Sequence, residues 1–277
     1  MSLVRRSLLA RLTGRRLVAS SLGAVTGFVF LALYAPILLV AVLSFFRLRR
    51  GKILWDSFSF QWYAELLSNR QLAEALTSSL VVGFFSVLVT LVLATLMAFY
   101  TDRQDTRWTL ALRFVIFLPF LLPPIITGLS LLVFFKEIGL SRGLITVIIG
   151  HSVFVLALVY QTILTRLQAL SRTLVEASQD LGATRWQTVR FVLLPNLRMA
   201  LVTASLLAFA LSFDETMITL FLVGDNATLP VRLYAMMRVG FTPEINALVT
   251  LILLFSTLLT IGIARFVGRD AGAQVGL

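Results

Sequence analysis

The sequence contains no cysteine, a single histidine and few charged residues. The absence of cysteine excludes disulfide bonds, thiolate metal sites and a cysteine nucleophile. Charged residues make up 13% of the 277 residues, and hydrophobic residues make up 58%. A typical soluble domain has about 25% charged residues. A water-soluble fold cannot bury this much apolar surface, so the composition excludes a soluble enzyme and indicates an integral membrane protein.

Long uncharged windows divide the sequence. Each is long enough to cross the roughly 30 Å hydrocarbon core as a helix of about 20 residues. One window is interrupted only by Asp214 and Glu215, which do not cancel the apolarity of its flanks. We therefore expect an all-α membrane protein with one membrane domain over residues 1–277. Its six predicted transmembrane helices are 20–46, 75–100, 114–135, 143–165, 199–224 and 245–265.

The basic residues predict the orientation. With both termini in the cytoplasm, the cytoplasmic segments hold more Lys and Arg than the external ones, as the positive-inside rule favours. Four cations depart from the rule, because Arg47, Arg49, Arg50 and Lys52 follow the first predicted helix on its external side. The net charge of +11 is therefore mainly a topology signal and does not indicate a nucleic-acid partner.

The first uncharged window is longer than a signal peptide requires. A signal h-region has about 7–15 residues and ends at a small-residue cleavage site, whereas the apolar sequence here continues to Phe46. We expect an uncleaved first helix, preceded by a short amphipathic helix over residues 2–16 on the membrane surface.

The predicted cytoplasmic loop 166–198 has a helical pattern of its own. It is longer than the about 2–8 residues that commonly join helices in a bundle. Thr173 and Glu176 match a capping box, and Gly182 fits a helix C-terminus, where glycine adopts the left-handed conformation without strain. A second short helix is expected at about 184–194, ending before the next proline. An apolar stripe lies at helical spacing: Leu174, Ala177 and Leu181. The loop is expected to present a rigid helix–Gly–helix elbow suited to docking.

Four segments resemble one family of membrane proteins. Residues 176–182 read Glu-Ala-Ser-Gln-Asp-Leu-Gly, and residues 191–195 read Phe-Val-Leu-Leu-Pro. Together they resemble the EAA motif of ABC-importer permeases, with Ser178 in place of the second alanine. The segments 211–216 and 229–247 are similar to spermidine/putrescine importer permeases, most of all to the second of the two permease subunits.

The resemblance implies a function and a set of partners. Such a permease forms half of the translocation path of an ATP-driven, binding-protein-dependent importer for polyamines or a related cation, in the bacterial cytoplasmic (inner) membrane. The implied partners are a second permease, usually a different chain, two ATPase subunits, an external substrate-binding protein and the lipid bilayer. The elbow would be the coupling helix that enters a groove of one ATPase. The residues assigned to this coupling are Glu176, Ala177, Ser178, Asp180, Gly182 and Pro195.

The chain contains no Gly-x-x-x-x-Gly-Lys-[Ser/Thr] sequence and therefore no P-loop. We expect no cofactor on this chain and no enzymatic activity of its own. In an ATP-driven importer, ATP and Mg²⁺ would be bound by separate ATPase subunits.

Acidic and proline residues at membrane depth are candidates for the substrate path. A central acidic residue costs about 2.5–3.5 kcal/mol on insertion scales, so Asp214 and Glu215 are expected to have a function, such as meeting the ammonium groups of a polyamine. One of them could instead pair with an arginine or cap a broken helix. Prolines in the third predicted helix are expected to kink it, either along the pathway or as a structural bend. The residues assigned to the path are Phe213, Asp214, Glu215, Pro123 and Pro124, and Pro119 is the third proline of the kink.

Two other functional classes are compatible with the same residues. The acidic pair could serve a proton-coupled secondary transporter, and Ser152 with His151 could serve an intramembrane hydrolase. No Gly-x-Ser-x-Gly motif or second histidine supports the hydrolase, so His151 is interpreted as a packing residue. No catalytic residue and no metal site are predicted.

Two further expectations concern the substrate and the external side. Within the importer class, amino-acid derivatives, opines and ferric iron are alternative substrates. A short external helix is predicted at 229–239, ended by Gly240, where it could meet the binding protein.

Overall fold

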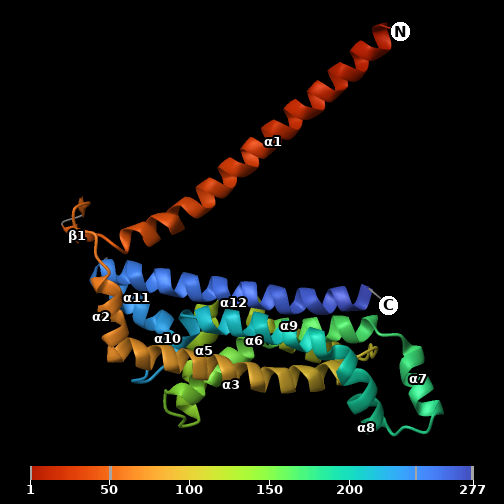
Figure 1. The fold of residues 1–277 in the computed structure, drawn as a ribbon. Coiled ribbons are helices and arrows are strands. Elements are labelled where there is room, and N and C mark those ends of the chain that lie inside the picture. The colour runs from red at the N-terminus through yellow and green to blue at the C-terminus, as the bar shows by residue number, and fades with distance from the viewer. Residues whose placement is uncertain (1, 50–51, 241, 276–277) are drawn as a thin grey trace. The chain divides into compact units, whose positions relative to one another are not determined.

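The computed structural model describes residues 2–49, 52–240 and 242–275, and it is mainly helical (Figure 1). Its contacts divide the chain into two compact units. The first comprises residues 1–68 and 240–269, and the second includes residues 69–239, called the central bundle below. The first unit contains α1 (Ser2–Leu43), β1 (Arg47–Arg49), β2 (Lys52–Leu54), α2 (Gln61–Ser68) and most of α12 (Pro243–Val275). The central bundle contains α3 (Arg70–Thr101), α4 (Arg107–Leu121), α5 (Pro124–Glu137), α6 (Leu144–Ala169), α7 (Arg172–Asp180), α8 (Arg185–Gln187), a π-helical turn η1 (Thr188–Leu193), α9 (Leu194–Asp214), α10 (Met217–Leu222) and α11 (Leu229–Val239).

Four helical stretches in the described residues are long and apolar enough to cross a membrane. They are Ser21–Leu43, α3, α6 and the stretch Arg185–Asp214. A fifth candidate is the pair α4 and α5, which is bent by 109° at its break. The described part of α12 includes a shorter apolar helix, Pro243–Leu258. The structure thus confirms a helical membrane protein and provides four to five of the predicted spans.

The break between α4 and α5 lies where the prolines predict it. Leu122 and Pro123 both have extended backbones, because a residue before proline is pushed away from the helical region. Pro124 then occupies the first turn of α5, where its missing N–H leaves no hydrogen bond unmade. Pro119, by contrast, lies inside α4 and does not end it. Two of the three prolines therefore make the bend.

The core of the central bundle lies where α3, α6 and α9 pack side by side (Figure 1). Small residues such as Ala94 on α3 and Ala208 on α9 are fully buried there, which lets the helix backbones approach closely. Hydroxyl groups also cross between helices. Ser86 Oγ donates to the carbonyl of Ile148 at 3.1 Å, and Thr90 Oγ1 donates to the carbonyl of Ser152 at 3.2 Å. Because both acceptors are α6 carbonyls, these bonds tie α3 to α6.

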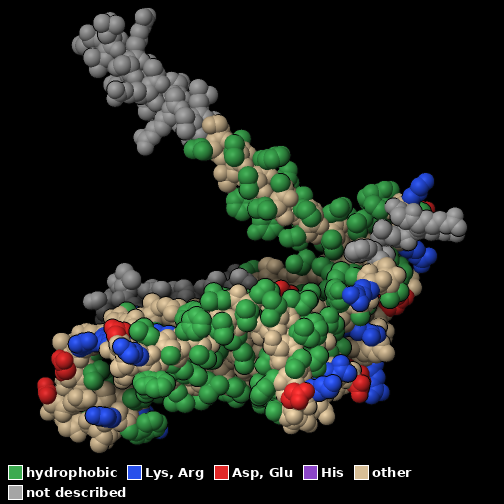
Figure 2. Space-filling model, turned by 180° about the vertical axis from the view of Figure 1, so that it is seen from behind, with side chains coloured by type: hydrophobic (Ala, Val, Ile, Leu, Met, Phe, Trp, Pro, Cys, Tyr) green, Lys and Arg blue, Asp and Glu red, His purple; other side chains and the backbone are tan. Residues whose placement is uncertain are grey.

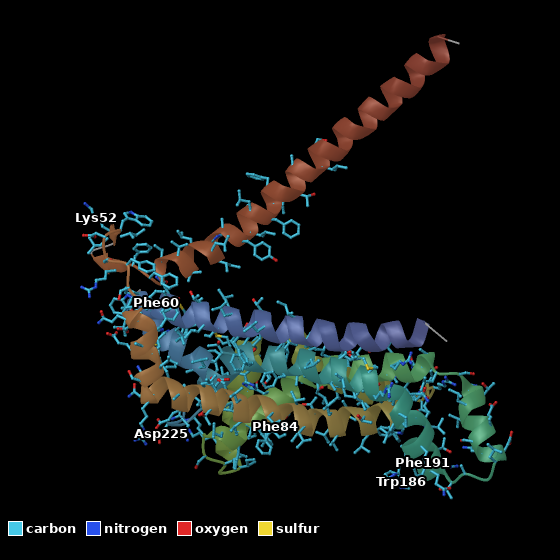
Figure 3. The ribbon with its side chains drawn as sticks, viewed as in Figure 1. Lys52, Phe60, Phe84, Trp186, Phe191 and Asp225 are labelled. Carbon is cyan, nitrogen blue, oxygen red and sulfur yellow. The ribbon has the colours of Figure 1, made fainter. Side chains whose placement is uncertain are left out.

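Large apolar side chains cover the sides of the central bundle. Figure 2 shows hydrophobic side chains along its visible face, with charged side chains gathered toward its ends. Phe84 on α3 is one such exposed ring (Figure 3). Exposed apolar surface of this kind is what a hydrocarbon environment requires.

The first unit carries a hairpin held by aromatic rings. β1 and β2 pair antiparallel, with Arg47 opposite Leu54. The ring of Phe45 packs on those of Phe58, Phe60 and Tyr63, at centroid distances of 5.2–5.5 Å. Figure 3 labels Lys52, on β2, and Phe60, one of these aromatic residues. Of the four cations noted in the sequence, Arg50 lies outside the described residues.

The start of the chain differs from the prediction of a separate short helix at 2–16. The backbone is helical without interruption from Ser2 to Leu43, so this segment is the first part of α1. The side chains of residues 2–16 lie outside the described ones.

Candidate functional site

The elbow at one end of the central bundle begins with α7 (Figure 1). Its N-cap is Ser171, whose hydroxyl accepts a hydrogen bond from the backbone N–H of Thr173 at 3.2 Å. The capping box predicted at Thr173 and Glu176 is therefore wrong, because an upstream serine already occupies the cap and Thr173 lies inside the first turn. The predicted C-terminal stop is confirmed. Gly182 has φ +82°, and its N–H donates to the carbonyl of Gln179 at 2.8 Å.

The prediction that the second helix of the elbow ends before Pro195 is wrong, because the helix continues through the candidate span Arg185–Asp214. It is capped by Thr184, whose hydroxyl accepts from the N–H of Gln187 at 3.3 Å. α8, η1 and α9 then follow without a break, as one helical stretch from residue 185 to 214. In η1 the N–H of Leu194 donates to the carbonyl of Val189, five residues back. This wider turn accommodates the proline at the start of α9, where a normal turn would bring its ring against a carbonyl.

The elbow presents apolar side chains to the outside. Leu181 is 89% exposed and Trp186 is 67% exposed, and Trp186 and Phe191 project at this end in Figure 3. The two elbow helices brace each other, because the hydroxyls of Ser178 and Thr188 lie 2.9 Å apart in a hydrogen bond. The other residues assigned to coupling are exposed: Glu176, Ala177, Asp180, Gly182 and Pro195. A braced knob with exposed apolar residues is suited to a protein groove.

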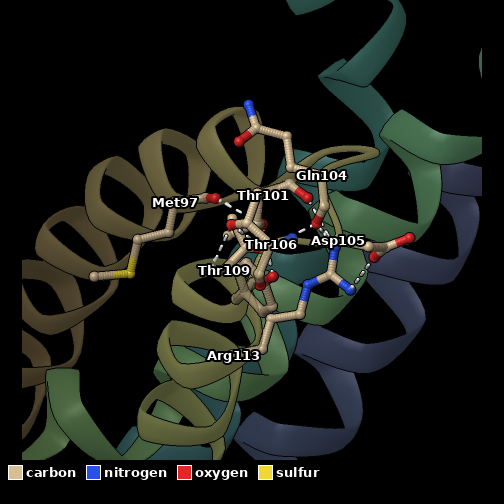
Figure 4. Close-up of polar contacts among 8 residues, drawn as sticks. Met97, Thr101, Gln104, Asp105, Thr106, Thr109 and Arg113 are labelled. Atoms are coloured by element: carbon tan, nitrogen blue, oxygen red, sulfur yellow. Dashed lines mark hydrogen bonds and ion pairs between the residues drawn. The ribbon is translucent and has the colours of Figure 1, made fainter.

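A polar network at the same end joins the α3–α4 turn to the root of the elbow. Arg103, a non-glycine residue with φ +53°, donates from Nη2 to the carbonyl of Leu170 at 2.7 Å. Arg113 on α4 donates from Nη2 to the carbonyl of Thr101 at 2.8 Å, and its Nη1 lies 3.6 Å from the Asp105 carboxylate (Figure 4). Arg103 and Arg113 could not be singled out from the sequence, because their partners are backbone carbonyls, which no sequence pattern marks.

Asp102 lies within this network. Partial burial raises the pKa of its carboxyl group above the usual value, although the nearby guanidinium groups of Arg103, Arg172 and Arg113 act in the opposite direction. Arg172 is the first residue of α7. The charge state of Asp102 is therefore coupled to the base of the elbow.

The fifth predicted span, 199–224, is broken where the acidic pair occurs. α9 ends at Asp214 and α10 begins at Met217; we call residues 215–216 the joint. The Glu215 carboxylate accepts hydrogen bonds from the N–H groups of Met217 at 2.8 Å and Ile218 at 3.0 Å. Glu215 thus caps a broken helix, which was one of the two alternatives from the sequence.

Asp214 has a different environment from its neighbour. Its side chain is exposed on the surface of the single chain. Within residues 2–49, 52–240 and 242–275, no hydrogen bond or ion pair is found on its carboxylate. A carboxylate without a partner at the end of a candidate span is a candidate contact for a cation.

His151 and Ser152 do not form a hydrolase pair. His151 is 1% exposed, with Nδ1 2.8 Å from the Ser212 hydroxyl and Nε2 2.7 Å from the Thr219 hydroxyl. The Ser152 hydroxyl donates instead to the carbonyl of Ile148 at 2.8 Å. The structure agrees with the interpretation of His151 as a packing residue, and it adds that His151 contacts helices on both sides of the joint.

The remaining candidates for the path lie on neighbouring elements. Phe213 stacks on Phe209 of α9, with ring centroids 5.9 Å apart. Pro123 is the N-cap of α5 and Pro124 is its first residue, and α5 packs against α10. The bend and the joint are thus joined through the α5–α10 contact.

The opposite end of the central bundle carries α11, whose predicted bounds are confirmed (Figure 1). It ends before Gly240, which has φ +143°. The N–H of Leu229 donates to the Ser79 hydroxyl at 2.8 Å, and Arg232 donates to the side chain of Gln71. Asp225, in the loop before this helix, lies at the same end in Figure 3. The elbow and α11 therefore mark the two ends of one bundle.

Comparison with known proteins gives consistent matches. The model of the family described as binding-protein-dependent transport system inner membrane component matches residues 91–271. The chain is 36% identical over 235 residues to the putrescine transport system permease protein PotI of Escherichia coli (strain K12), covering 82% of this chain and 83% of the relative. It is 32% identical over 234 residues to the spermidine/putrescine transport system permease protein PotC of Haemophilus influenzae, covering 84% and 91%.

Solved structures share the fold at lower sequence identity. A chain of a bacterial ABC transporter involved in the import of the acidic polysaccharide alginate matches with a TM-score of 0.68 and 16% identity, covering 93% of this chain and 97% of that one. A chain of the MetNI methionine ABC transporter, in an inward-facing conformation, matches with a TM-score of 0.61 and 22% identity, covering 76% and 99%. These two matches concern the fold alone.

Proposed function

Because the chain belongs to the family of binding-protein-dependent transport system inner membrane components, we propose that it is a permease subunit of an ATP-driven polyamine importer. The relatives named for spermidine and putrescine transport support this substrate class. The chain would form half of the translocation path in the bacterial cytoplasmic membrane.

One observation carries the proposal: the elbow and Asp214 are the two ends of the same helical stretch. The stretch runs from Arg185 through η1 and α9 to Asp214 without interruption. A helix transmits displacement along its axis because its backbone hydrogen bonds resist bending. Motion imposed on the elbow therefore reaches the open carboxylate directly.

In the proposed topology, six spans place both termini in the cytoplasm. The spans are Ser21–Leu43, α3, the bent pair α4–α5, α6, the broken pair α9–α10, and α12. Two observations support this arrangement: the elbow and α11 lie at opposite ends of the central bundle, and the basic residues favour the elbow side.

The partners follow from the two ends. The exposed apolar elbow would enter a groove of an ATPase subunit, which supplies the ATP and Mg²⁺ chemistry. A substrate-binding protein would approach the end that carries α11. A second permease subunit would complete the path. The alginate and methionine transporters are ABC transporters with the same chain fold, which supports partners of these kinds.

The transport step is mechanical in this proposal. Closure of the ATPase pair would push the elbow, and α9 would carry that push to the joint. The permease pair would then change which side of the membrane its path faces, as a packed element with two arrangements. The Asp214 carboxylate would attract ammonium groups in a water-filled path, where an open charge costs less than in lipid.

Substitution of Asp214 tests the proposal. Asp214→Asn removes the charge and keeps the shape, so uptake of radiolabelled putrescine should fall, while the ATPase subunits still co-purify with the chain. Asp56→Asn is the matched control, because it removes an exposed carboxylate outside the central bundle to which no role is assigned. Undiminished uptake by Asp214→Asn would contradict the assigned role. Uptake driven by a proton gradient without the ATPase would support a secondary transporter instead.

A further inference from the structure

α10 is held by the helices beside it rather than by α9 alone. A Cβ atom added at Gly128 of α5 would lie 3.0 Å from the Cα of Ile218. A Cβ atom added at Gly150 of α6 would lie 2.5 Å from a methyl carbon of Leu222. Both distances are shorter than ordinary carbon contacts of about 3.5–4.0 Å. α10 is therefore seated closely against α5 and α6 at two glycines.

α9, by contrast, is attached to the elbow. Its backbone is continuous with η1 and α8, and it packs against α3 and α6. At the joint the backbone bond is long, because the N–H of Glu215 donates to the carbonyl of Ser212 at 3.4 Å. Both segments pack against α6, and they differ in their other supports, which are α3 for α9 and α5 for α10.

His151 bonds to both segments. Its Nδ1 meets Ser212 on α9, and its Nε2 meets Thr219 on α10. All three side chains are buried, with exposed fractions of 1%, 3% and 0% for His151, Ser212 and Thr219. Water is therefore kept from competing for these hydrogen bonds, and an unmade bond would leave a buried polar group unsatisfied.

The network assigns the donors. The Thr219 hydroxyl donates its single proton to the carbonyl of Glu215 at 2.9 Å, so it accepts from His151. His151 must then carry its proton on Nε2 and accept at Nδ1 from the Ser212 hydroxyl. A neutral imidazole satisfies both positions at once. The resulting chain of hydrogen bonds runs from Ser212 through His151 and Thr219 to the carbonyl of Glu215. It therefore connects the end of α9 to α10 and to the joint between them.

We propose that His151 is a positioning residue that sets the angle between α9 and α10 and thereby the place of the Asp214 carboxylate. Ser212 lies two residues before Asp214, and Thr219 lies on the segment seated against α5 and α6. When the elbow moves α9, the hydrogen bond between His151 and Ser212 either holds α9 against α10 or breaks. The effect on transport rests on the proposed function; the effect on the joint does not.

Distance measurements by pulsed electron paramagnetic resonance test the structural part. The chain has no cysteine, so spin labels can be placed at Leu207→Cys on α9 and Leu220→Cys on α10, both exposed sites. The assembled transporter would be used in nanodiscs, with cysteine-free partner subunits. His151→Phe keeps a ring of similar size without the hydrogen bonds, and Ser212→Ala removes a single hydroxyl. Both should widen the distribution of distances between the labels.

Transport measurements on the same variants give the functional part. The ratio of polyamine uptake to ATP hydrolysis should fall at least about fivefold, the lower end of common coupling effects. Ser152→Ala is the matched control, because the adjacent hydroxyl bonds to the carbonyl of Ile148 and does not reach the joint. It should leave both the distances and the ratio unchanged.

The outcomes separate the two proposals. Native-like distances in both His151→Phe and Ser212→Ala would overturn the positioning role, even if the chain transports polyamines. If His151→Phe does not fold, Ser212→Ala alone decides, because it loses one oxygen atom only. Widened distances in a chain that does not transport polyamines would support the positioning role and contradict the proposed substrate.

Discussion

The contact between α5 and α10 gives the sharpest prediction about the joint. Gly128→Ala places a Cβ atom 2.9 Å from Cδ2 of Phe221 and 3.0 Å from the Cα of Ile218. The first neighbour is the edge of a ring, which can rotate away. The second is backbone, and it can give way only if α10 shifts as a unit. The substitution should therefore displace the segment that begins directly after the joint.

The magnitude follows from two opposing effects. Overpacking of this kind typically costs about 1–3 kcal/mol, whereas alanine in place of glycine inside a helix gains about 0.5–1 kcal/mol. The net loss of stability should therefore lie between about zero and 2.5 kcal/mol. Gly27→Ala on α1 is the control for the helix gain alone, because nothing lies within 4 Å of its added Cβ.

Thermal unfolding and uptake by the assembled transporter measure the result. Gly128→Ala should unfold at a lower temperature than Gly27→Ala and should take up less polyamine. Gly150→Ala provides an internal comparison, because its nearest neighbour is Cδ1 of Leu222, the end of a flexible side chain and not backbone. It should lose less activity than Gly128→Ala. The reasoning is refuted if Gly128→Ala matches Gly27→Ala in both assays.

Three further predictions concern other parts of the chain. Leu181→Asp puts a charge on the exposed apolar tip of the elbow. Affinity for the ATPase, measured by titration of purified subunits, should fall at least about tenfold, or 1.4 kcal/mol. Unchanged affinity would exclude Leu181 from the docking surface. The pKa of Asp102 is higher in the folded chain than in the unfolded chain, so stability falls as pH rises and the carboxyl group becomes charged. Asp102→Asn stays neutral and should therefore unfold at a higher temperature than the native chain at pH 7. That difference should shrink at a pH low enough to protonate Asp102, and a difference independent of pH would count against the assignment. Ser152→Ala should leave uptake and thermal stability near native. Loss of a peptidase activity in that variant would support the alternative of an intramembrane hydrolase.

The sequence predicted the helical elements well where a pattern was local. The glycines at 182 and 240 fixed two helix ends, because a left-handed backbone favours glycine. The paired prolines at 123 and 124 fixed the bend between α4 and α5. Each of these signals acts on its immediate neighbours, so one sequence is enough to read it.

The errors arose where neighbouring turns decided the outcome. Pro195 was expected to end a helix, yet a π-helical turn before it removes the clash between the proline ring and a backbone carbonyl. No residue pattern indicates such a turn. The capping box at Thr173 was displaced by Ser171, two residues upstream, which forms an equally good cap. Local rules of similar strength competed there, and the sequence does not rank them.

The candidate site was predicted in part for a related reason. Asp214 and Glu215 were singled out because carboxylates are costly in a membrane, and the break in the fifth span lies beside them. The role of His151 was not visible, because its partners at 212 and 219 are 61 and 68 residues away in the chain. Long-range hydrogen bonds of this kind depend on how the helices pack, which a single sequence does not specify.

The most direct test of the account is uptake by a reconstituted transporter. The chain would be placed in proteoliposomes with its partner permease and ATPase subunits, and radiolabelled putrescine would be supplied with the substrate-binding protein. We expect uptake that requires ATP and the binding protein and that unlabelled spermidine reduces by competition. Uptake that continues without ATP under a proton gradient, or transport of another substrate class with no putrescine uptake, would contradict it.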